Sequence, residues 1–358
     1  MRVVLVCGAC PPGACGVGDY TRCLAEALSA IAIEAHVLSS GSWRLHDSFG
    51  VFRSLRRLNP DVVHIQYPSL GFGTNLGPQA FALLQPCVIT LHEASQAHIL
   101  RKLALLPFSI RSKHIIFPSE FERRFATRWA PWISRISSVV GVPSNIKAAA
   151  LRAARTIEEI AHFGLIMPNK GLEEVIKLGA LIQVSGLPLR IRIIGAVPAK
   201  HVRYFEVLRS ESSHLPIVWE TGLDKKEVED RLAVSAVTYL PYPDGASERR
   251  ASLKAALING VAVLTTRGPQ TPTDLEGCAC FVQTPEQALA AASDLLANPE
   301  KRGRLISKGL QYAQQYSWER IAEQHSALYH QLLDGRNVPE GLPVKNAERP
   351  ASSSFLKL

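Results

Sequence analysis

Residues 240–266 read LPYPDGASERRASLKAALINGVAVLTT, and this stretch decides the fold. The apolar run 233–240 leads into it and predicts a short buried strand. The tripeptide Pro-Asp-Gly at 243–245 predicts a turn, and 261–264 predicts a second strand beyond a helix. A strand, a glycine-containing loop, a helix and a further strand form the repeating unit of a parallel α/β sheet.

The helix between these strands carries a pair of arginines. Ser247 is suited to be its N-cap, so the helix begins near Glu248, and Gly260 ends it. Arg249 and Arg250 then fall in the first turn, where cations oppose the helix dipole. The pair indicates a bound anion beyond the carboxyl ends of the strands, where open α/β sheets bind ligands. Two solvated arginines on an exposed helix end are an equal alternative.

The α/β pattern recurs along the 358 residues, a length typical of two domains. Strands are expected in the first part at 3–7, 36–38, 62–65, 87–91 and 114–117. Helices are expected at 20–30, 79–84 and 97–106, and a further one carries Arg123 and Arg124. They predict a doubly wound parallel sheet over 1–150, followed by a linker at 151–158. A second domain of this kind is expected over 159–316, a helix returning to the N-terminal domain at 317–334, and a disordered tail at 335–358.

Composition excludes several classes of protein. Apolar residues make up 47% of the chain and charged residues 20%, as in globular domains, and no apolar run approaches the about 18 residues of a membrane span. The N-terminus enters a strand at once, which argues against a secretion signal. Seven cysteines, an odd number, favour a reducing compartment, so we expect a cytoplasmic protein. Cys7 and Cys10 have zinc-ligand spacing, but Cys278 and Cys280 do not complete a site, and no metal is expected.

Positive charge is concentrated in the first domain. Residues 1–150 hold 15 Lys and Arg against 8 Asp and Glu, so they carry +7 of the net charge of +9. The densest segment, 97–135, interleaves its cations with Phe108, Phe121, Phe125, Trp129 and Trp132. Such a mixture suits the headgroup layer of an anionic membrane, and no nucleic-acid-binding motif accompanies it. A peripheral position at the inner face of the cell membrane and a plain solvated surface are both open, and no nucleic acid is expected.

Two features of the first domain are candidate site elements. A glycine-rich loop follows the first strand and contains Gly16, Val17, Gly18 and Asp19, without the full spacing of a dinucleotide fingerprint. It provides close backbone approach to a ligand, or simply a tight turn. His92, followed by Glu93, ends the strand 87–91, where open α/β sheets place site residues; a buried structural histidine is the alternative.

The second domain supplies a third candidate element. Residues 164–171, GLIMPNKG, lead from a strand to a helix and place Lys170 at the helix start. A later strand ends on Gly195, so the backbone beyond it belongs to the same edge of the sheet.

Together these segments resemble the GT4-type glycosyltransferases, which are retaining enzymes of the GT-B architecture. The segment 164–171 looks like the family's G-x-x-x-P-x-K-G motif, whose lysine contacts the donor diphosphate. Residues 253–266 look like its LxxAxxxGxPVxxT stretch, and 15–20 like its acceptor-side glycine loop. Residues 90–93 look like the segment whose histidine lies by the donor sugar. The resemblance extends to about residue 334.

The chain departs from the usual family pattern at three positions. The paired glutamates of the family would fall on Ser247 and Ala255, and a common arginine on Leu165. A branch of the family carries D-G-x-S-x-R-R-x-S-L instead, and residues 244–253, DGASERRASL, resemble that branch. We interpret the missing glutamates as divergence within this branch.

The resemblance implies a hexosyltransferase-type enzyme that moves a sugar from a UDP- or GDP-sugar to a glycan or lipid-linked acceptor. It implies retention of configuration and a place in polysaccharide or glycolipid biosynthesis. The implied catalytic residues are His92, Lys170 and Arg249. The implied donor-binding residues are Gly164, Lys170, Gly195, Gly245, Ser247, Arg249, Arg250 and Ser252, and the acceptor-side residues are Gly16, Val17, Gly18, Asp19, His92 and Glu93.

The charge on the leaving nucleotide must be stabilised in the cleft. The chain contains no DxD metal motif, so Lys170, Arg249 and Arg250 are expected to provide the positive field without a metal or other cofactor. Two alternatives remain: a nucleotide-sugar epimerase of the same architecture, which the few carboxylates near the loops disfavour, and an inactive, partner-binding homologue, suggested by Ser247 and Ala255.

Overall fold

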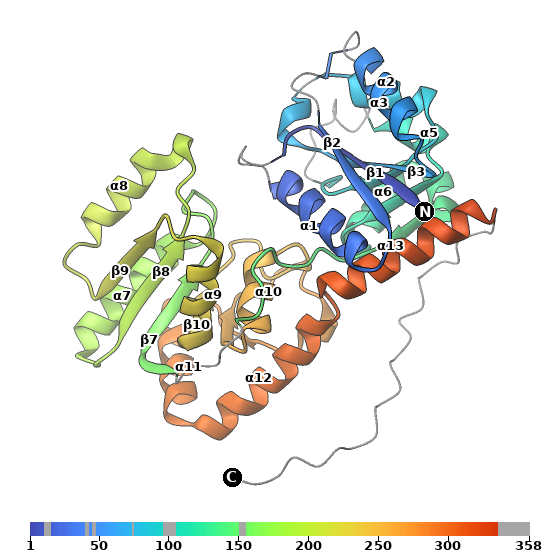
Figure 1. The fold of residues 1–358 in the computed structure, drawn as a ribbon. Helices are drawn as coiled ribbons and strands as arrows, with labels where there is room; N and C mark the ends of the chain where they lie inside the picture. The colour runs from blue at the N-terminus through green and yellow to red at the C-terminus, as the bar shows by residue number, and fades with distance from the viewer. Residues whose placement is uncertain are drawn as a thin grey trace.

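A computed structural model describes residues 1–10, 16–39, 43–44, 48–73, 75–95, 105–149 and 155–335. The chain forms two α/β domains, each built on a six-stranded sheet (Figure 1). All strand pairs in both sheets are parallel, which confirms the predicted fold class. Most of the helix expected at 97–106, part of the linker expected at 151–158 and nearly all of the tail expected at 335–358 lie outside the described residues.

The N-terminal sheet has the strand order β2-β1-β3-β4-β5-β6. Its strands are β1 (Arg2–Cys7), β2 (Glu34–Ser39), β3 (Val62–Tyr67), β4 (Val88–Leu91), β5 (His114–Phe117) and β6 (Ser137–Val139). The helices of this domain are α1 (Gly16–Ala30), α2 (Ser48–Leu58), η2 (Leu70–Phe72), α3 (Gly77–Leu84), α5 (Leu106–Arg111), α6 (Glu120–Trp129) and η3 (Pro131–Ile136). The inner strands β3, β4 and β5 are buried at every residue, as expected for a parallel sheet covered on both faces.

The C-terminal sheet has the order β12-β11-β10-β7-β8-β9. Its strands are β7 (Thr156–Phe163), β8 (Arg190–Gly195), β9 (Ile217–Thr221), β10 (Ser235–Leu240), β11 (Ala262–Thr265) and β12 (Cys280–Phe281). Its helices are α7 (Leu172–Ser185), η4 (Ala199–His201), α8 (Val202–Glu211), α9 (Lys225–Val234), α10 (Ala251–Ile258), η5 (Thr273–Leu275), α11 (Pro285–Ala297) and α12 (Pro299–Gln314). Elements α2, β6, α8 and β12 have no counterpart among the predicted elements.

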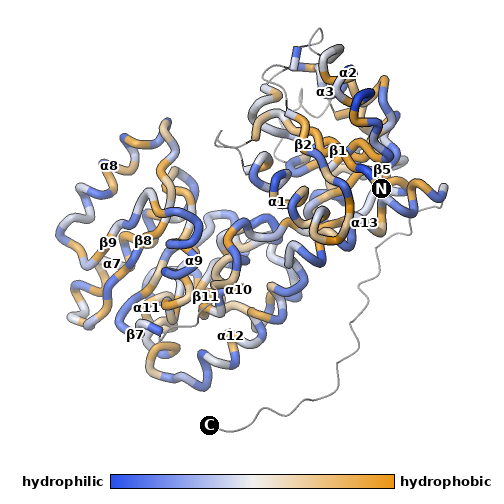
Figure 2. The backbone as a smooth tube through the Cα atoms, in the orientation of Figure 1, coloured by the Kyte–Doolittle hydropathy of each residue, from blue (hydrophilic) through white to orange (hydrophobic). Residues whose placement is uncertain are grey.

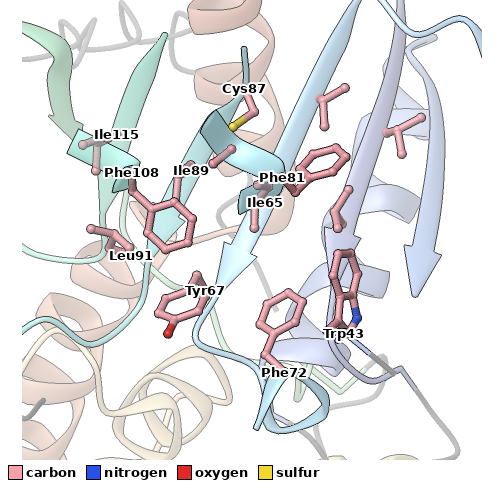
Figure 3. Close-up of a cluster of buried hydrophobic side chains, with 14 of the residues drawn as sticks. Trp43, Ile65, Tyr67, Phe72, Phe81, Cys87, Ile89, Leu91, Phe108 and Ile115 are labelled. Atoms are coloured by element: carbon pink, nitrogen blue, oxygen red, sulfur yellow. The ribbon is translucent and has the colours of Figure 1, made fainter. Parts of the chain in front are cut away.

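The largest core cluster of the N-terminal domain is rich in aromatic residues (Figure 3). The ring centroids of Tyr67 and Phe108 are 4.9 Å apart, as are those of Trp43 and Phe72. Phe108 is fully buried, so its assignment to the basic and aromatic surface was wrong; α5 turns this side chain inward onto β4. In Figure 2 the strand labelled β1 is coloured largely as hydrophobic, in keeping with its burial in the sheet.

The last helix, α13 (Trp318–Leu333), packs along the N-terminal domain although it follows the C-terminal domain in sequence (Figure 1). Its residues Ile321, Leu328 and Tyr329 belong to the same buried cluster as Leu24 of α1. The chain therefore crosses between the domains twice. The first crossing follows β6 and contains Gly141, and the second, between α12 and α13, contains Tyr316. The two crossings are in contact, because a Cβ on Gly141 would lie 2.5 Å from the ring of Tyr316. No described helix is both long and apolar enough to cross a membrane.

Two helix starts differ from the predictions. Helix α10 begins at Ala251 rather than near Glu248, and Ser247 lies in the preceding loop and does not cap it. The backbone N–H of Ala246 donates to Thr266 O at the end of β11, which holds this loop in a non-helical path. Arg250 consequently occupies the N-cap position, one residue outside the helix.

The second difference concerns the predicted glycine loop. Gly16, Val17, Gly18 and Asp19 form the first turn of α1 rather than a loop. A Cβ on Gly18 would lie 2.1 Å from Ala9 O, so the glycine allows this turn to pack against the backbone after β1. Asp19 in the first turn is favoured by the helix dipole.

Candidate active site

A cleft of about 420 Å³ lies at the carboxyl ends of β7, β8 and β10. Its wall in the C-terminal domain contains the predicted donor-side residues Gly164, Lys170, Gly195, Arg249, Arg250 and Ser252. The cleft is also lined by Ser144, Asn145 and Ile146, which follow the N-terminal domain in the chain, and by Leu223, Asp224 and Lys225 at the start of α9. Gly245 and Ser247 do not line the cleft; they lie behind it in the loop before α10.

Lys170 reaches the cleft because of the loop that follows β7. Gly171 adopts a positive φ of 78° as N-cap of α7, and a Cβ there would lie 1.8 Å from Pro241 O. Only glycine fits this close approach of two loops at the strand ends. Burial lowers the pKa of Lys170, and the guanidinium of Arg250 lowers it further, whereas the Glu93 carboxylate raises it. Lys170 therefore lies within electrostatic reach of groups from both domains.

Arg250 is held against the floor of the cleft. Its guanidinium donates to Asp244 and lies 4.5 Å from the ring centroid of Tyr242. The hydroxyl of Tyr242 is in turn 2.7 Å from Ser252 Oγ. Burial lowers the pKa of Arg250. The Asp244 carboxylate already balances the charge of Arg250, so an anionic ligand bound at this place would share the guanidinium with Asp244.

Several buried polar atoms around the cleft lack a hydrogen-bond partner in the described part of the chain. They are Arg249 Nε, Arg250 Nε and His162 Nε2, and all three residues line the cleft. Buried polar groups are normally paired, and an unpaired set at one cleft marks a place where a polar ligand would bind.

His162, near the end of β7, was not among the predicted site residues. Its Nδ1 lies 2.9 Å from Tyr239 O, which requires a proton on Nδ1 and leaves Nε2 as an acceptor. Burial lowers the His162 pKa to about 4, so the ring is neutral. The one sequence signal was its place at a strand end, two residues before Gly164.

His92 lies at the end of β4 in the N-terminal domain. Its Nε2 is 2.9 Å from Gln66 Oε1, and its ring meets Tyr20 of α1 edge-on at a centroid distance of 5.0 Å. Burial lowers the His92 pKa to about 4, so this ring is also neutral. His92 does not line the 420 Å³ cleft; it stands on the opposite domain with its neighbour Glu93.

Three acidic residues of the N-terminal domain face cations of the C-terminal domain. Arg249 Nη1 lies 3.3 Å from Glu122 Oε1, and Lys225 Nζ lies 3.7 Å from Asp19 Oδ1. The third is Glu93, whose negative charge raises the pKa of Lys170. Of the predicted acceptor-side set, Asp19 and Glu93 therefore approach the donor side, whereas Gly16 and Gly18 shape the first turn of α1.

Glu122, in α6, is a further site residue that sequence reasoning missed. Its side chain is fully buried, and its carboxylate accepts hydrogen bonds from Ala94 N at 2.9 Å, Ser95 N at 2.8 Å and Ser95 Oγ at 2.6 Å. It thus fixes the backbone that follows His92 and Glu93 while it binds Arg249. In the sequence it was one acidic residue within a basic segment, and nothing local marked it.

No cluster of three or more His, Cys, Asp or Glu that could hold a metal ion occurs among the described residues.

Ala255, where the GT4 family usually has a glutamate, is fully buried in an apolar cluster with Ile194, Val228 and Leu232. A carboxylate at this position would be surrounded by apolar side chains.

The comparisons with known proteins agree with this geometry. No family model matches the sequence, and no curated protein matches it. Among solved structures, a sucrose-phosphate synthase from Thermosynechococcus elongatus is similar with a TM-score of 0.70 at 14% identity, covering 94% of this chain and 100% of that chain. A glycosyltransferase from Rickettsia africae gives a TM-score of 0.72 at 11% identity, covering 93% and 98%.

A third structure, Anabaena HepE in complex with UDP and glucose, gives a TM-score of 0.68 at 11% identity, covering 92% of this chain and 100% of that chain. These likenesses extend over nearly the whole of each protein. They show that the chain has the GT-B fold, with two parallel six-stranded sheets and their surrounding helices.

Proposed function

We propose that the protein is a GT4-type glycosyltransferase that moves a hexosyl group from a UDP- or GDP-sugar to a glycan or lipid-linked acceptor, with retention. The observation that carries this proposal is the group of partly buried cations, Lys170, Arg249 and Arg250, at the carboxyl ends of the C-terminal sheet. The similar HepE structure contains UDP and glucose, and a similar starch synthase IV structure from Arabidopsis thaliana contains ADP and acarbose, which supports a nucleotide-sugar donor.

Each cation has a distinct role in this proposal. Lys170 and Arg250 bind the donor diphosphate and stabilise the negative charge that develops on the leaving nucleotide. Arg249 shares its guanidinium between Glu122, Gln270 and the phosphate side of the cleft. These charges replace a divalent metal, so transfer is expected to be independent of metal ions.

The N-terminal domain provides the other half of the site. The neutral His92 positions the donor sugar from across the cleft, because an uncharged imidazole accepts or donates one hydrogen bond without adding charge. In this proposal the carboxylates of Glu93 and Asp19, which approach cations of the C-terminal domain, bind hydroxyls of the sugars between the two domains.

We also propose that an anionic membrane is the surface on which the acceptor is met. Leu106, Ile110, Trp129 and Trp132 are between 40% and 67% exposed on α5, α6 and η3. The exposed cations of the same segment are Arg111, Lys113, Arg124, Arg128 and Arg135. Each cation near an anionic leaflet contributes about 1 kcal/mol. Arg123 does not belong to this face, because its guanidinium donates to Ser137 Oγ at 3.1 Å and to Ser134 O.

The membrane proposal is tested by sedimentation with phosphatidylserine-containing vesicles at low and high salt. Arg128→Glu with Arg135→Glu should abolish the low-salt binding, while Arg203→Glu on the exposed face of α8 in the other domain should not. Equal binding by all variants, or none by the wild type at low salt, contradicts the proposal.

Transfer itself is tested by incubating the protein with UDP- and GDP-hexoses and lipid-linked acceptors, and analysing nucleotide release and products by mass spectrometry. Transfer with retained anomeric configuration is the expected result. An epimerised sugar without transfer would identify the epimerase alternative. Nucleotide-sugar binding without chemistry would identify an inactive homologue.

A further inference from the structure

A chain of hydrogen bonds runs through the buried core of the N-terminal domain from α13 to His92. The hydroxyl of Tyr329 lies 2.6 Å from His64 Nδ1. His64 Nε2 lies 2.8 Å from Thr90 Oγ1 and 3.1 Å from Gln66 Nε2. Gln66 Oε1 lies 2.9 Å from His92 Nε2. Tyr329, His64 and Gln66 are each fully buried, and Thr90 is nearly so.

The donors and acceptors along this chain fix a direction. In the orientation that the Gln66 amide has in the structure, its Nε2 donates, so the Nε2 atom of His64 accepts and carries no proton. The proton of His64 is then on Nδ1 and is donated to the Tyr329 oxygen. Gln66 Oε1 can only accept, so His92 carries its proton on Nε2. The Nδ1 atom of His92 is left as an acceptor without a hydrogen bond from the described residues.

Both rings are neutral, which this direction requires. Burial lowers the pKa of His64 well below its ordinary value, and the pKa of His92 is lowered to about 4 for the same reason. A neutral imidazole with one nitrogen bound by the protein presents its other nitrogen in a single protonation state.

Helix α13 also supports His92 through the packing of aromatic rings. Tyr20 meets the His92 ring edge-on, and the Tyr20 ring also lies tilted against Trp318 at a centroid distance of 5.3 Å. Trp318 is the first residue of α13, and its Nε1 donates to Ser144 O at the first crossing. Both the hydrogen-bond chain and the ring stack that hold His92 therefore begin on α13.

We propose that Gln66 and Tyr329 are positioning residues that hold His92 with its proton on Nε2, so that Nδ1 is presented as an acceptor to a hydroxyl of the sugar substrates. This role rests on the proposed glycosyl transfer. Through Tyr329, helix α13 would then contribute to the active site in addition to connecting the domains. Burying four polar groups is unfavourable unless each is paired, and an apolar core would be simpler, so the chain is better explained by this task than by stability.

The test uses Gln66→Met, which breaks the link to His92 at similar volume, and Tyr329→Phe, which removes one hydroxyl. Tyr312→Phe is the matched control, because it removes a buried tyrosine hydroxyl from the C-terminal domain. The ring ¹⁵N shifts of His92 report its tautomer without any need for activity. Steady-state kinetics with a nucleotide sugar separate kcat from KM.

In the wild type we expect the Nε2–H tautomer of His92. Gln66→Met should give a mixture of tautomers and lower kcat by about 10- to 100-fold, the scale for groups that orient a site residue, with KM for the donor changed less than threefold. Tyr329→Phe should shift both readouts in the same direction by less, and Tyr312→Phe should change neither. An Nδ1–H tautomer in the wild type, or unaltered His92 shifts in Gln66→Met, overturns the proposal. If the shifts behave as expected but no sugar is transferred by the wild type, glycosyl transfer fails while the positioning of His92 stands.

Discussion

Arg249 Nη1 lies 3.3 Å from Glu122 Oε1, and this ion pair joins the two domains across the cleft. Glu122 is fully buried, and the Arg249 side chain is only 15% exposed. A second nitrogen of the guanidinium donates to Gln270 at 3.0 Å. A residue that sequence reasoning assigned to the donor alone is therefore also part of the contact between domains.

Glu122→Gln should destabilise the protein by about 3 kcal/mol, because it leaves a buried guanidinium without its counter-charge. The matched control is Glu120→Gln on the same helix, where the carboxylate is 43% exposed and pairs with Arg124. An exposed pair of this kind contributes less than about 1 kcal/mol. Urea denaturation measures both. An equal decrease in the free energy of unfolding of both variants would show that the Glu122–Arg249 pair contributes no more than the exposed pair.

The titration of Lys254 should make the free energy of unfolding depend on pH in the alkaline range. Its ammonium is buried beside the first crossing, donates to Val142 O at 2.5 Å and to Glu248 O, and lies 3.8 Å from the Tyr316 ring centroid. Burial lowers the Lys254 pKa to about 7, against about 10.4 in the unfolded chain. Between these values the unfolded state binds more protons, so the free energy of unfolding rises with pH.

The Lys254→Met variant should lack this rise between pH 7 and 9.5, while Lys226→Met, on the exposed face of α9, should keep it. Urea denaturation at the two pH values measures the difference. A rise of the same size in Lys254→Met would mean that Lys254 is charged throughout the range.

Acid should unfold the protein between pH 6.5 and 4. Burial lowers the pKa of His92, His114, His162 and His325 to about 4. An unfolded histidine has a pKa of about 6.5, so the unfolded state takes up these protons first and is favoured as the pH falls. His114→Gln should weaken the dependence and the exposed His214→Gln should not, as followed by far-UV circular dichroism. Identical acid midpoints for wild type and His114→Gln would contradict this prediction.

Transfer should survive removal of metal ions. The basis is the absence of a DxD motif together with the cation group of Lys170, Arg249 and Arg250 at the cleft. We expect the same initial rate with EDTA as with added magnesium or manganese. Loss of activity in EDTA that either metal restores would show that a metal ion, and not these side chains alone, stabilises the leaving nucleotide.

The sequence was sufficient for the fold because its signals are local. Apolar runs bounded by Gly, Pro and Asn predict strands, and alternation with helices predicts parallel sheets. The same local signals bring Lys170, Arg249 and Arg250 to one edge of the sheet. They gave the wrong start for α10, because the path of its preceding loop is set by Thr266 at the end of the next strand.

Other parts of the site depend on contacts that no local pattern reveals. Glu122 and Arg249 come from different domains, and Tyr329 meets His64 across 265 positions of the chain. His162 becomes notable only when its Nδ1 is seen to bind Tyr239 O and its Nε2 is left unpaired. Such pairings follow from tertiary packing, so they could not be read from periodicity or from single motifs.

Calorimetric titration with UDP and GDP measures whether the cations at the carboxyl ends of the C-terminal sheet bind a nucleoside diphosphate, as we propose. Lys170→Ala and Arg250→Ala each remove a preorganised charged contact, worth about 2–4 kcal/mol, so the Kd should rise at least about 30-fold. Lys177→Ala on the exposed face of α7, where Lys177 pairs with Glu174, should leave it unchanged. Wild-type protein that binds neither nucleotide, or variants of Lys170 and Arg250 that bind as tightly as the wild type, would contradict the account.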